Sequence, residues 1–129
     1  MGRAIWMALA VIAASAAHAQ DEAVRQAAAF MSSTKDRIFI AQLTDEATEE
    51  DARTFAAARE RTVGKMTAIY FYEPEARIPA EALTSAQSVA EANKLLDDPD
   101  MSAWRYVFMH YKTGSSEFVD CAEPNDLCR

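Results

Sequence analysis

Apolar and polar residues follow two different spacings along this chain, and the changes between them predict where strands and helices lie. Residues 37–43 (RIFIAQL) form a continuous run of β-branched and aromatic residues, typical of a strand buried on both faces. Residues 67–73 (TAIYFYE) predict a second strand, which Pro74 ends. Residues 104–112 (WRYVFMHYK) and 117–121 (EFVDC) predict two more, joined by a turn.

Helical spacing predicts three helices between and before these strands. Residues 21–31 repeat apolar positions at Val24, Ala27, Ala28 and Met31. Residues 44–62 predict a helix capped by Thr48, with acidic residues in its first turn, arginines 59 and 61 in its last turn, and Gly64 ending it. Thr84 and Gln87 form a capping-box pattern ahead of a helix that extends to Leu96.

The last two predicted strands define a hairpin register. Gly114 and Ser115 fit the two central positions of a type II′ turn, in which glycine comes first. Counting outward gives an opposite-charge pair and then an aromatic pair, which favours this tight turn over a longer loop. The expected pairs are Lys112–Glu117, Tyr111–Phe118, His110–Val119, Met109–Asp120 and Phe108–Cys121.

The predicted order is one helix followed by β-α-β-α-β-β. This order indicates a single α/β (α+β) domain with a mixed four-stranded sheet, in which the first strands are parallel, the C-terminal pair forms an antiparallel hairpin and helices cover the sheet. The order is similar to that of thioredoxin-like domains. However, residues 44–47 (TDEA) stand where a C-x-x-C would follow the first strand, and no proline directly precedes Trp104.

The N-terminus predicts export. Residues 1–19 combine Arg3, an apolar run at residues 5–14 and the small-x-small sequence at residues 17–19, which is the pattern of a secretory signal peptide. The expected mature domain, residues 20–129, carries 12 basic against 20 acidic residues after the loss of Arg3. Such a balance disfavours nucleic acids and anionic membranes as partners, and membrane insertion is not expected after cleavage.

The two cysteines, Cys121 and Cys128, most simply form a structural disulfide. Catalytic thiols typically occur as C-x-x-C at a helix N-terminus, and structural zinc requires four ligands, whereas the mature chain has two cysteines and one histidine. An exported chain permits disulfides. The remaining interpretations are free, intermolecular or redox-active thiols.

Few residues are candidates for catalysis or binding. His110 is the general base that the mature chain offers, and Asp120 is a carboxylate on an apolar strand. Glu73 and Glu75 follow the second strand, at the kind of sheet edge where sites of α/β proteins gather, so the loop at residues 73–82 is the place to look for one. Each of these residues also has a plain structural role as a packed histidine or a solvated carboxylate.

These observations favour a binding module over an enzyme. The mature chain contains two glycines, so no glycine-rich phosphate loop is possible, and no G-x-S-x-G or S-x-x-K sequence is present. We therefore expect a small exported protein without catalytic activity, metal or cofactor that binds another envelope protein or a ligand. The alternatives are an acid-base hydrolase that uses Glu73, Glu75, His110 and Asp120, and a thioredoxin-like redox protein.

The tyrosine, tryptophan and phenylalanine side chains of the strands are either core or an exposed binding patch. Alternation places Tyr70 and Tyr72 on one face of their strand and Phe71 on the other. It also places Trp104, Tyr106 and Phe108 together on one face of theirs. Because helices must cover such a sheet, we expect these rings to lie mainly in the core.

Overall fold

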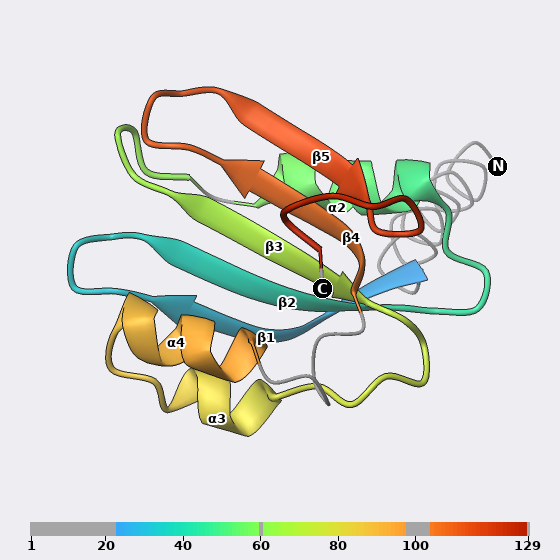
Figure 1. The fold of residues 1–129 in the computed structure, drawn as a ribbon, viewed down its shortest axis with the longest axis horizontal. Coiled ribbons are helices and arrows are strands. Elements are labelled where there is room, and N and C mark those ends of the chain that lie inside the picture. Colours follow the sequence, from blue (N-terminus) through green and yellow to red (C-terminus); the bar gives the residue numbers. More distant parts are fainter. Residues whose placement is uncertain (1–22, 60, 98–103, 129) are drawn as a thin grey trace, which may run out of the picture.

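The computed structural model describes residues 23–59, 61–97 and 104–128, which form a small α+β domain around one mixed sheet (Figure 1). The sheet has five strands in the order β1-β2-β3-β4-β5. The elements are β1 (Val24–Met31), β2 (Arg37–Leu43), α2 (Glu49–Ala58), β3 (Thr67–Tyr72), α3 (Ala80–Thr84), α4 (Val89–Leu96), β4 (Trp104–His110) and β5 (Ser116–Asp120). The predicted signal peptide lies outside the described residues.

The mixed character of the sheet is confirmed. Strands β2 and β3 are parallel, and the pairs β1–β2, β3–β4 and β4–β5 are antiparallel. Helix α2 lies on one face of the sheet, and α3 and α4 lie on the other together with the C-terminal tail (Figure 1). Because β2 and β3 are covered on both faces, their residues are buried almost without interruption, as the sequence predicted.

The sheet separates two hydrophobic cores. The core under α2 contains Phe39, Ile69 and Phe71 of the sheet and Ala52 and Ala56 of the helix. The core under α3 and α4 contains these buried residues: Ile38, Ile40, Tyr70, Tyr72, Leu83, Leu96, Trp104 and Val107. The aromatic strand residues are therefore mostly core, and Tyr70 and Tyr72 lie on the face opposite to Phe71 as predicted.

The prediction of an N-terminal helix is wrong, because Val24–Met31 forms strand β1. Its helical spacing comes largely from alanines, but antiparallel pairing with β2 decides the conformation. A bulge between Gln26 and Ala28 leaves Ala27 and Met31 exposed, although both belonged to the predicted helical stripe. The sheet therefore has five strands rather than four, and the domain does not begin with a helix.

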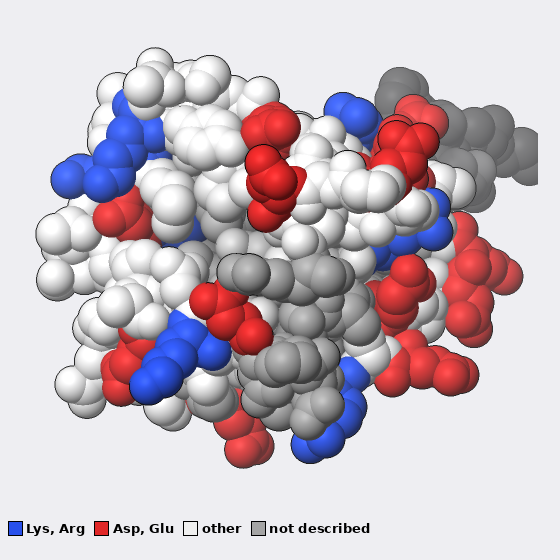
Figure 2. Space-filling model, in the orientation of Figure 1, with Lys and Arg blue, Asp and Glu red and all other residues white. Residues whose placement is uncertain are grey.

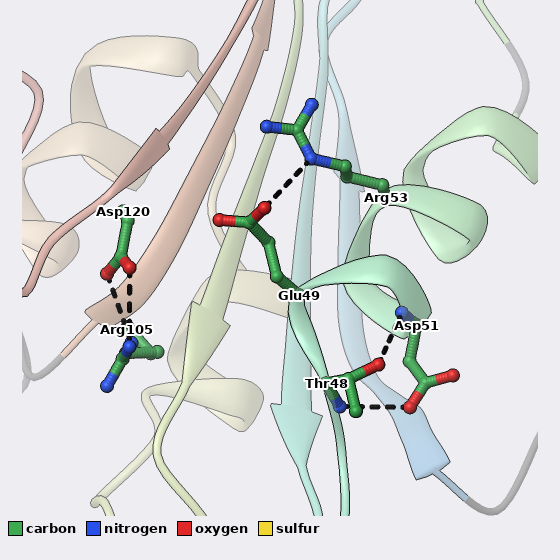
Figure 3. Close-up of polar contacts among 6 residues, drawn as sticks. All are labelled: Thr48, Glu49, Asp51, Arg53, Arg105 and Asp120. Carbon is green, nitrogen blue, oxygen red and sulfur yellow. Dashed lines mark hydrogen bonds and ion pairs between the residues drawn. The ribbon is translucent and has the colours of Figure 1, made fainter.

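The N-terminus of helix α2 is confirmed. Its N-cap Thr48 accepts a hydrogen bond from the Asp51 backbone N–H at 3.2 Å, and the Asp51 carboxylate accepts one from the Thr48 backbone N–H at 2.9 Å (Figure 3). The helix ends at Ala58, earlier than predicted, so arginines 59 and 61 follow it rather than forming its last turn. Gly64, with φ of 76°, lies in the turn before β3.

The predicted helix behind Thr84 begins later, as α4 at Val89, and a separate short helix, α3, precedes it where the sequence predicted mainly a loop. Helix α3 ends at Thr84, and Ser88 rather than Thr84 caps α4, where its hydroxyl accepts a hydrogen bond from the Glu91 N–H at 3.1 Å. The Glu91 carboxylate accepts from the Gln87 N–H at 2.7 Å. The pattern S-x-x-E at residues 88–91 therefore competes successfully with the T-x-x-Q pattern four residues earlier.

The predicted hairpin register is also wrong. Phe108 pairs with Phe118, and His110 pairs with Ser116. The Tyr111 N–H donates to the Ser115 carbonyl at 2.8 Å, and the Gly114 N–H donates to the Tyr111 carbonyl at 3.0 Å. With Gly114 at φ of 95°, these bonds define a three-residue loop whose glycine takes the left-handed position, instead of a two-residue turn.

The new register changes the partners of the candidate residues. Asp120 pairs with Tyr106 instead of Met109, and His110 no longer faces Val119. Glu117 lies opposite Met109, and its carboxylate accepts a hydrogen bond from the Tyr111 hydroxyl at 2.9 Å. This hydrogen bond to the Glu117 carboxylate raises the pKa of the Tyr111 hydroxyl.

A bulge separates Trp104 from the other aromatic residues of β4. Phe71 pairs with Tyr106, while the next residue, Tyr72, pairs with Trp104. The extra residue, Arg105, reverses the alternation, so Trp104 joins the core under α3 and α4 while Tyr106 and Phe108 join the core under α2. The expectation that all three rings share one face is therefore wrong.

Within residues 23–59, 61–97 and 104–128, no helix has the length and apolar character needed to cross a membrane.

Candidate functional site: an arginine-aromatic groove beside helix α2

His110 lies far from the carboxylates with which the sequence grouped it. It pairs with Thr67 at the start of β3, and its Nδ1 lies 2.7 Å from the Ser116 hydroxyl. Asp120 is opposite Tyr106, four residues along β4 from His110, which corresponds to about 13 Å of strand. Glu73 follows the far end of β3. The structure therefore does not bring a histidine and a carboxylate together at these positions.

Asp120 is engaged in a structural ion pair. Its carboxylate lies 3.1 Å from the Arg105 Nε and accepts a hydrogen bond from the Arg105 Nη2 at 3.3 Å (Figure 3). It also accepts a hydrogen bond from the Ala122 N–H at 2.9 Å. Glu73 interacts electrostatically with the same guanidinium. Arg105 thus fixes Asp120 in an ion pair at one end of the sheet.

The loop after β3 contributes exposed carboxylates. Glu73 and Glu75 are exposed on either side of Pro74, and the Pro74 carbonyl accepts a hydrogen bond from Gln42 Nε2 at 2.8 Å. On the face of the molecule shown in Figure 2, acidic side chains are most numerous along the right-hand edge, beside the β2–α2 and β3–α3 loops. This loop is therefore part of an acidic, solvated rim.

The disulfide between Cys121 and Cys128 is present, with 5.5 Å between the two Cα atoms. It turns the tail back over the face that carries α3 and α4 (Figure 1), and Leu127 packs against the core there. A hollow of about 240 Å³ lies beside the tail and is lined by these residues: Tyr70, Asn93, Leu96, Asp97, Trp104, Asp126 and Leu127. The Tyr70 and Trp104 ring centroids are 4.7 Å apart.

A different arrangement lies on the α2 side of β4 and β5. Phe71 is at its centre, with ring centroids of Phe55, Phe118 and Tyr106 at 5.8, 6.1 and 6.3 Å. Tyr106 and Phe118 are 5.4 Å apart. Offset and edge-to-face rings at these distances form a stable aromatic cluster, which supports the surface above it.

Arginine side chains cover the outer rings of this cluster. The guanidinium carbon of Arg53 lies 4.2 Å from the Phe118 ring centroid, and that of Arg61 lies 5.0 Å from the Phe108 centroid. Phe108 and Phe118 are a cross-strand pair, so the two cations lie over adjacent rings. Cation–π contacts of this kind hold a guanidinium flat over a ring while its N–H groups remain at the rim.

Between these groups is a hollow of about 120 Å³, which we call the arginine-aromatic groove; it is lined by Arg53, Ala56, Ala57, Arg61, Phe108 and Phe118. The small alanine side chains of α2 line the groove on the helix side, and the two phenylalanine rings line it on the sheet side. A hollow of this size accepts one side chain or a ring-sized group rather than a nucleotide or an oligosaccharide.

Nearby anions neutralise the groove only in part. Arg53 Nε lies 3.4 Å from the Glu49 carboxylate, with both side chains about half exposed (Figure 3), so this ion pair is weak in water. Arg61 Nη2 donates to the Ala56 carbonyl at 3.3 Å, which orients the guanidinium without neutralising it. The groove is therefore a local cationic site on an acidic protein, suited to a carboxylate carried on an apolar or planar group.

The described residues contain no group of three histidine, cysteine, aspartate or glutamate side chains that could hold a metal ion. The residues that line the groove combine two guanidiniums with two aromatic rings, and the Glu49 carboxylate lies beside Arg53. The geometry of the groove suits binding, in which shape and charge select a ligand.

The sequence alone missed the groove. Arginines 59 and 61 were predicted in the last turn of the helix, and the predicted hairpin register placed Phe118 opposite Tyr111 rather than Phe108. A signal did exist, since Arg53, Ala57 and Arg61 follow each other at intervals of four residues, beside the buried stripe of Ala52 and Ala56. Only the position of β5 shows what those arginines cover.

Comparisons of this chain with protein-family models, curated proteins and solved structures find no match. Its function must therefore be argued from its own residues.

Proposed function

We propose that this protein is a small exported module without catalytic activity that binds another envelope protein through the arginine-aromatic groove. The observation that carries the proposal is the pairing of Arg53 and Arg61 with two adjacent aromatic rings around an open hollow. Arginine and aromatic residues are the types enriched where proteins bind one another.

Export rests on the signal-peptide pattern and is compatible with the disulfide, which oxidising compartments permit. The partner side chain that best fits the groove carries a carboxylate. At physiological ionic strength, charges more than about 8 Å away are largely screened, so the nearby guanidiniums outweigh the distant acidic residues.

A photo-crosslinking amino acid placed at Ala57 tests this proposal in cells that produce the protein. Ala57 is exposed and lines the groove, and Ala90 is a matched control because it is an exposed alanine on α4, on the opposite side of the sheet. We expect a discrete covalent adduct from position 57 and none from position 90. The double variant Arg53→Gln, Arg61→Gln should reduce the adduct severalfold.

Equal adduct yields from both positions would contradict the proposal, as would a yield at position 57 that does not depend on the two arginines. The double variant must keep the unfolding midpoint of the parent within a few degrees for the comparison to count.

A further inference from the structure

The groove continues into an unpaired sheet edge. Among the described residues, β5 is the last strand of the sheet, and it pairs with β4 along one side only. Its register shows no bulge, and it contains no proline. Such an edge offers its free backbone groups to another strand.

The hydrogen bonds of the hairpin show which residues face outward. The Cys121 N–H donates to the Arg105 carbonyl at 2.7 Å, and the Tyr111 N–H donates to the Ser115 carbonyl. Because bonded and non-bonded pairs alternate in an antiparallel ladder, Glu117 and Val119 are also bonded to β4. Ser116, Phe118 and Asp120 therefore direct their backbone N–H groups away from β4.

The opposite edge of the sheet is less accessible. Strand β1 is interrupted by the bulge between Gln26 and Ala28, and helix α3 packs beside it (Figure 1). Bulges and covering elements are the usual protection of sheet edges against further pairing. The two edges thus differ, and the edge at β5 is the more accessible one for pairing with a further strand.

We propose that an extended, carboxylate-bearing segment of the partner protein adds to β5 as a sixth strand and places a Glu or Asp side chain opposite Phe118. This proposal rests on the proposed function and specifies how the groove is used. In an antiparallel pair, Cβ atoms of opposite residues are about 4.5–5.5 Å apart and on the same face. A carboxylate opposite Phe118 would then lie within reach of Arg53, which sits over that ring.

Charge selects this occupant over a second copy of the chain. Two copies paired antiparallel about Phe118 would bring their two Arg53 guanidiniums to the same face beside one another. An acidic strand instead gives Arg53 a partner while the backbone bonds of Phe118 are satisfied.

The test is a titration of the full-length, 15N-labelled protein with the blocked peptide Thr-Val-Glu-Val-Thr and its analogue with Lys in place of Glu. The Glu peptide should bind at least about tenfold more tightly than the Lys peptide, the difference of one charge-assisted contact. Amide shifts should be largest at Ser116, Phe118 and Asp120 and smaller at Glu117 and Val119.

Methylated peptides separate strand addition from simple charge binding. With Glu opposite Phe118, the Glu N–H donates to the Phe118 carbonyl, so N-methylation of Glu should abolish binding. N-methylation of a flanking Val, whose N–H faces away from β5, should have little effect. Arg53→Gln should remove the preference for Glu over Lys, whereas Arg25→Gln, which changes an exposed arginine on β1, should preserve it.

Equal binding of the Glu and Lys peptides would overturn the proposal, as would equal effects of the two methylations. Concentration-dependent dimerisation through the same amides would show that a second copy is the occupant instead. If the peptides fail while the arginine-dependent adduct at position 57 forms, the groove binds a partner without strand addition. If neither is seen, the proposed function fails as well.

Discussion

The aromatic residues on the two faces of the sheet are covered by different kinds of groups. On the face with α3 and α4, Tyr70 and Trp104 lie beneath a tail fixed by the Cys121–Cys128 disulfide, with Asp97 and Asp126 at the rim. On the face with α2, Phe108 and Phe118 lie beneath arginine side chains. A covalent bond holds the tail, whereas weak contacts hold the arginine side chains. A ligand can therefore displace the arginine side chains at a low cost in free energy.

The two faces therefore differ in how their outermost groups are held, and the proposed binding site lies on the α2 face. A disulfide restricts the unfolded chain whatever the ligand does. A guanidinium over a ring contributes about 0.5–1 kcal/mol at an exposed site and still presents its N–H groups to an anion. Replacing the disulfide on one face and Arg53 on the other should therefore separate stability from the proposed binding.

The largest expected effect comes from the centre of the aromatic cluster. Phe71→Ala removes a side chain that is fully buried and contacts three other rings, so it should lower the free energy of unfolding by about 3–4 kcal/mol. Urea denaturation measures the loss. Peptide binding should fall too, because the cluster supports Phe118; binding that survives unchanged would show that the groove does not depend on it.

The second effect tests the covalent cover. Replacing Cys121 and Cys128 together with serine should lower the free energy of unfolding by about 2–3 kcal/mol, the value of closing so short a loop. Amide exchange should increase in the tail and not in β2 or β3, and the affinity for the Glu peptide should be unchanged. A loss of peptide binding at full folding would contradict the division of roles between the faces.

Asp36, in the turn between β1 and β2, gives a pH-dependent effect. The Met66 N–H donates to its carboxylate at 2.9 Å, and this bond lowers the pKa of Asp36 despite the burial of the side chain. Because the folded-state pKa is depressed, the stabilisation is present above the unfolded pKa of about 4 and is lost as the pH falls through the folded pKa.

Asp36→Asn should therefore lower stability by about 1–2 kcal/mol near pH 7, with a deficit that shrinks below about pH 4. Denaturation curves across this range measure the change. A deficit that is independent of pH would show that the hydrogen bond and not the charge provides the stabilisation.

The smallest effect on stability belongs to Arg53. Its ion pair with Glu49 is exposed and its ring contact is weak, so Arg53→Gln should change the free energy of unfolding by less than about 1 kcal/mol. The same substitution should remove most of the charge preference in peptide binding. Thermal unfolding and the titration, made on the same samples, provide the comparison. A large loss of stability would make Arg53 a structural residue.

Local sequence patterns predicted the parts of the fold that depend on local physics. The buried strands β2 and β3, the Thr48 N-cap and the disulfide were all predicted correctly, because each depends on nearby residues or on continuous burial. The alanine-rich segment of β1 was not, because its conformation depends on pairing with β2, and a short helical spacing of alanines is a weak signal.

The candidate site depends even more than strand β1 on contacts that local sequence patterns do not predict. The carboxylates and His110 are recognisable as chemical types, but their separation follows from strand register and from the order of the sheet. A shift of three positions in the hairpin exchanged the partner of Phe118 from Tyr111 to Phe108. Side chains alternate between the two faces of a strand. A shift by an odd number of residues therefore places a given side chain of β5 on the same face as a different set of β4 side chains.

By itself, the sequence determined the mixed α/β character, the boundaries of the buried strands, the acidic surface and the cysteine pair, since these follow from composition, spacing and local hydrogen bonding. The tertiary structure decided that Arg53 and Arg61 lie over Phe108 and Phe118, and that β5 ends the sheet with its outer edge unpaired among the described residues. The arginines and the rings they cover are 47 and 65 residues apart in the sequence, and only the packing of α2 on the sheet and the loop at Gly114 bring them into contact.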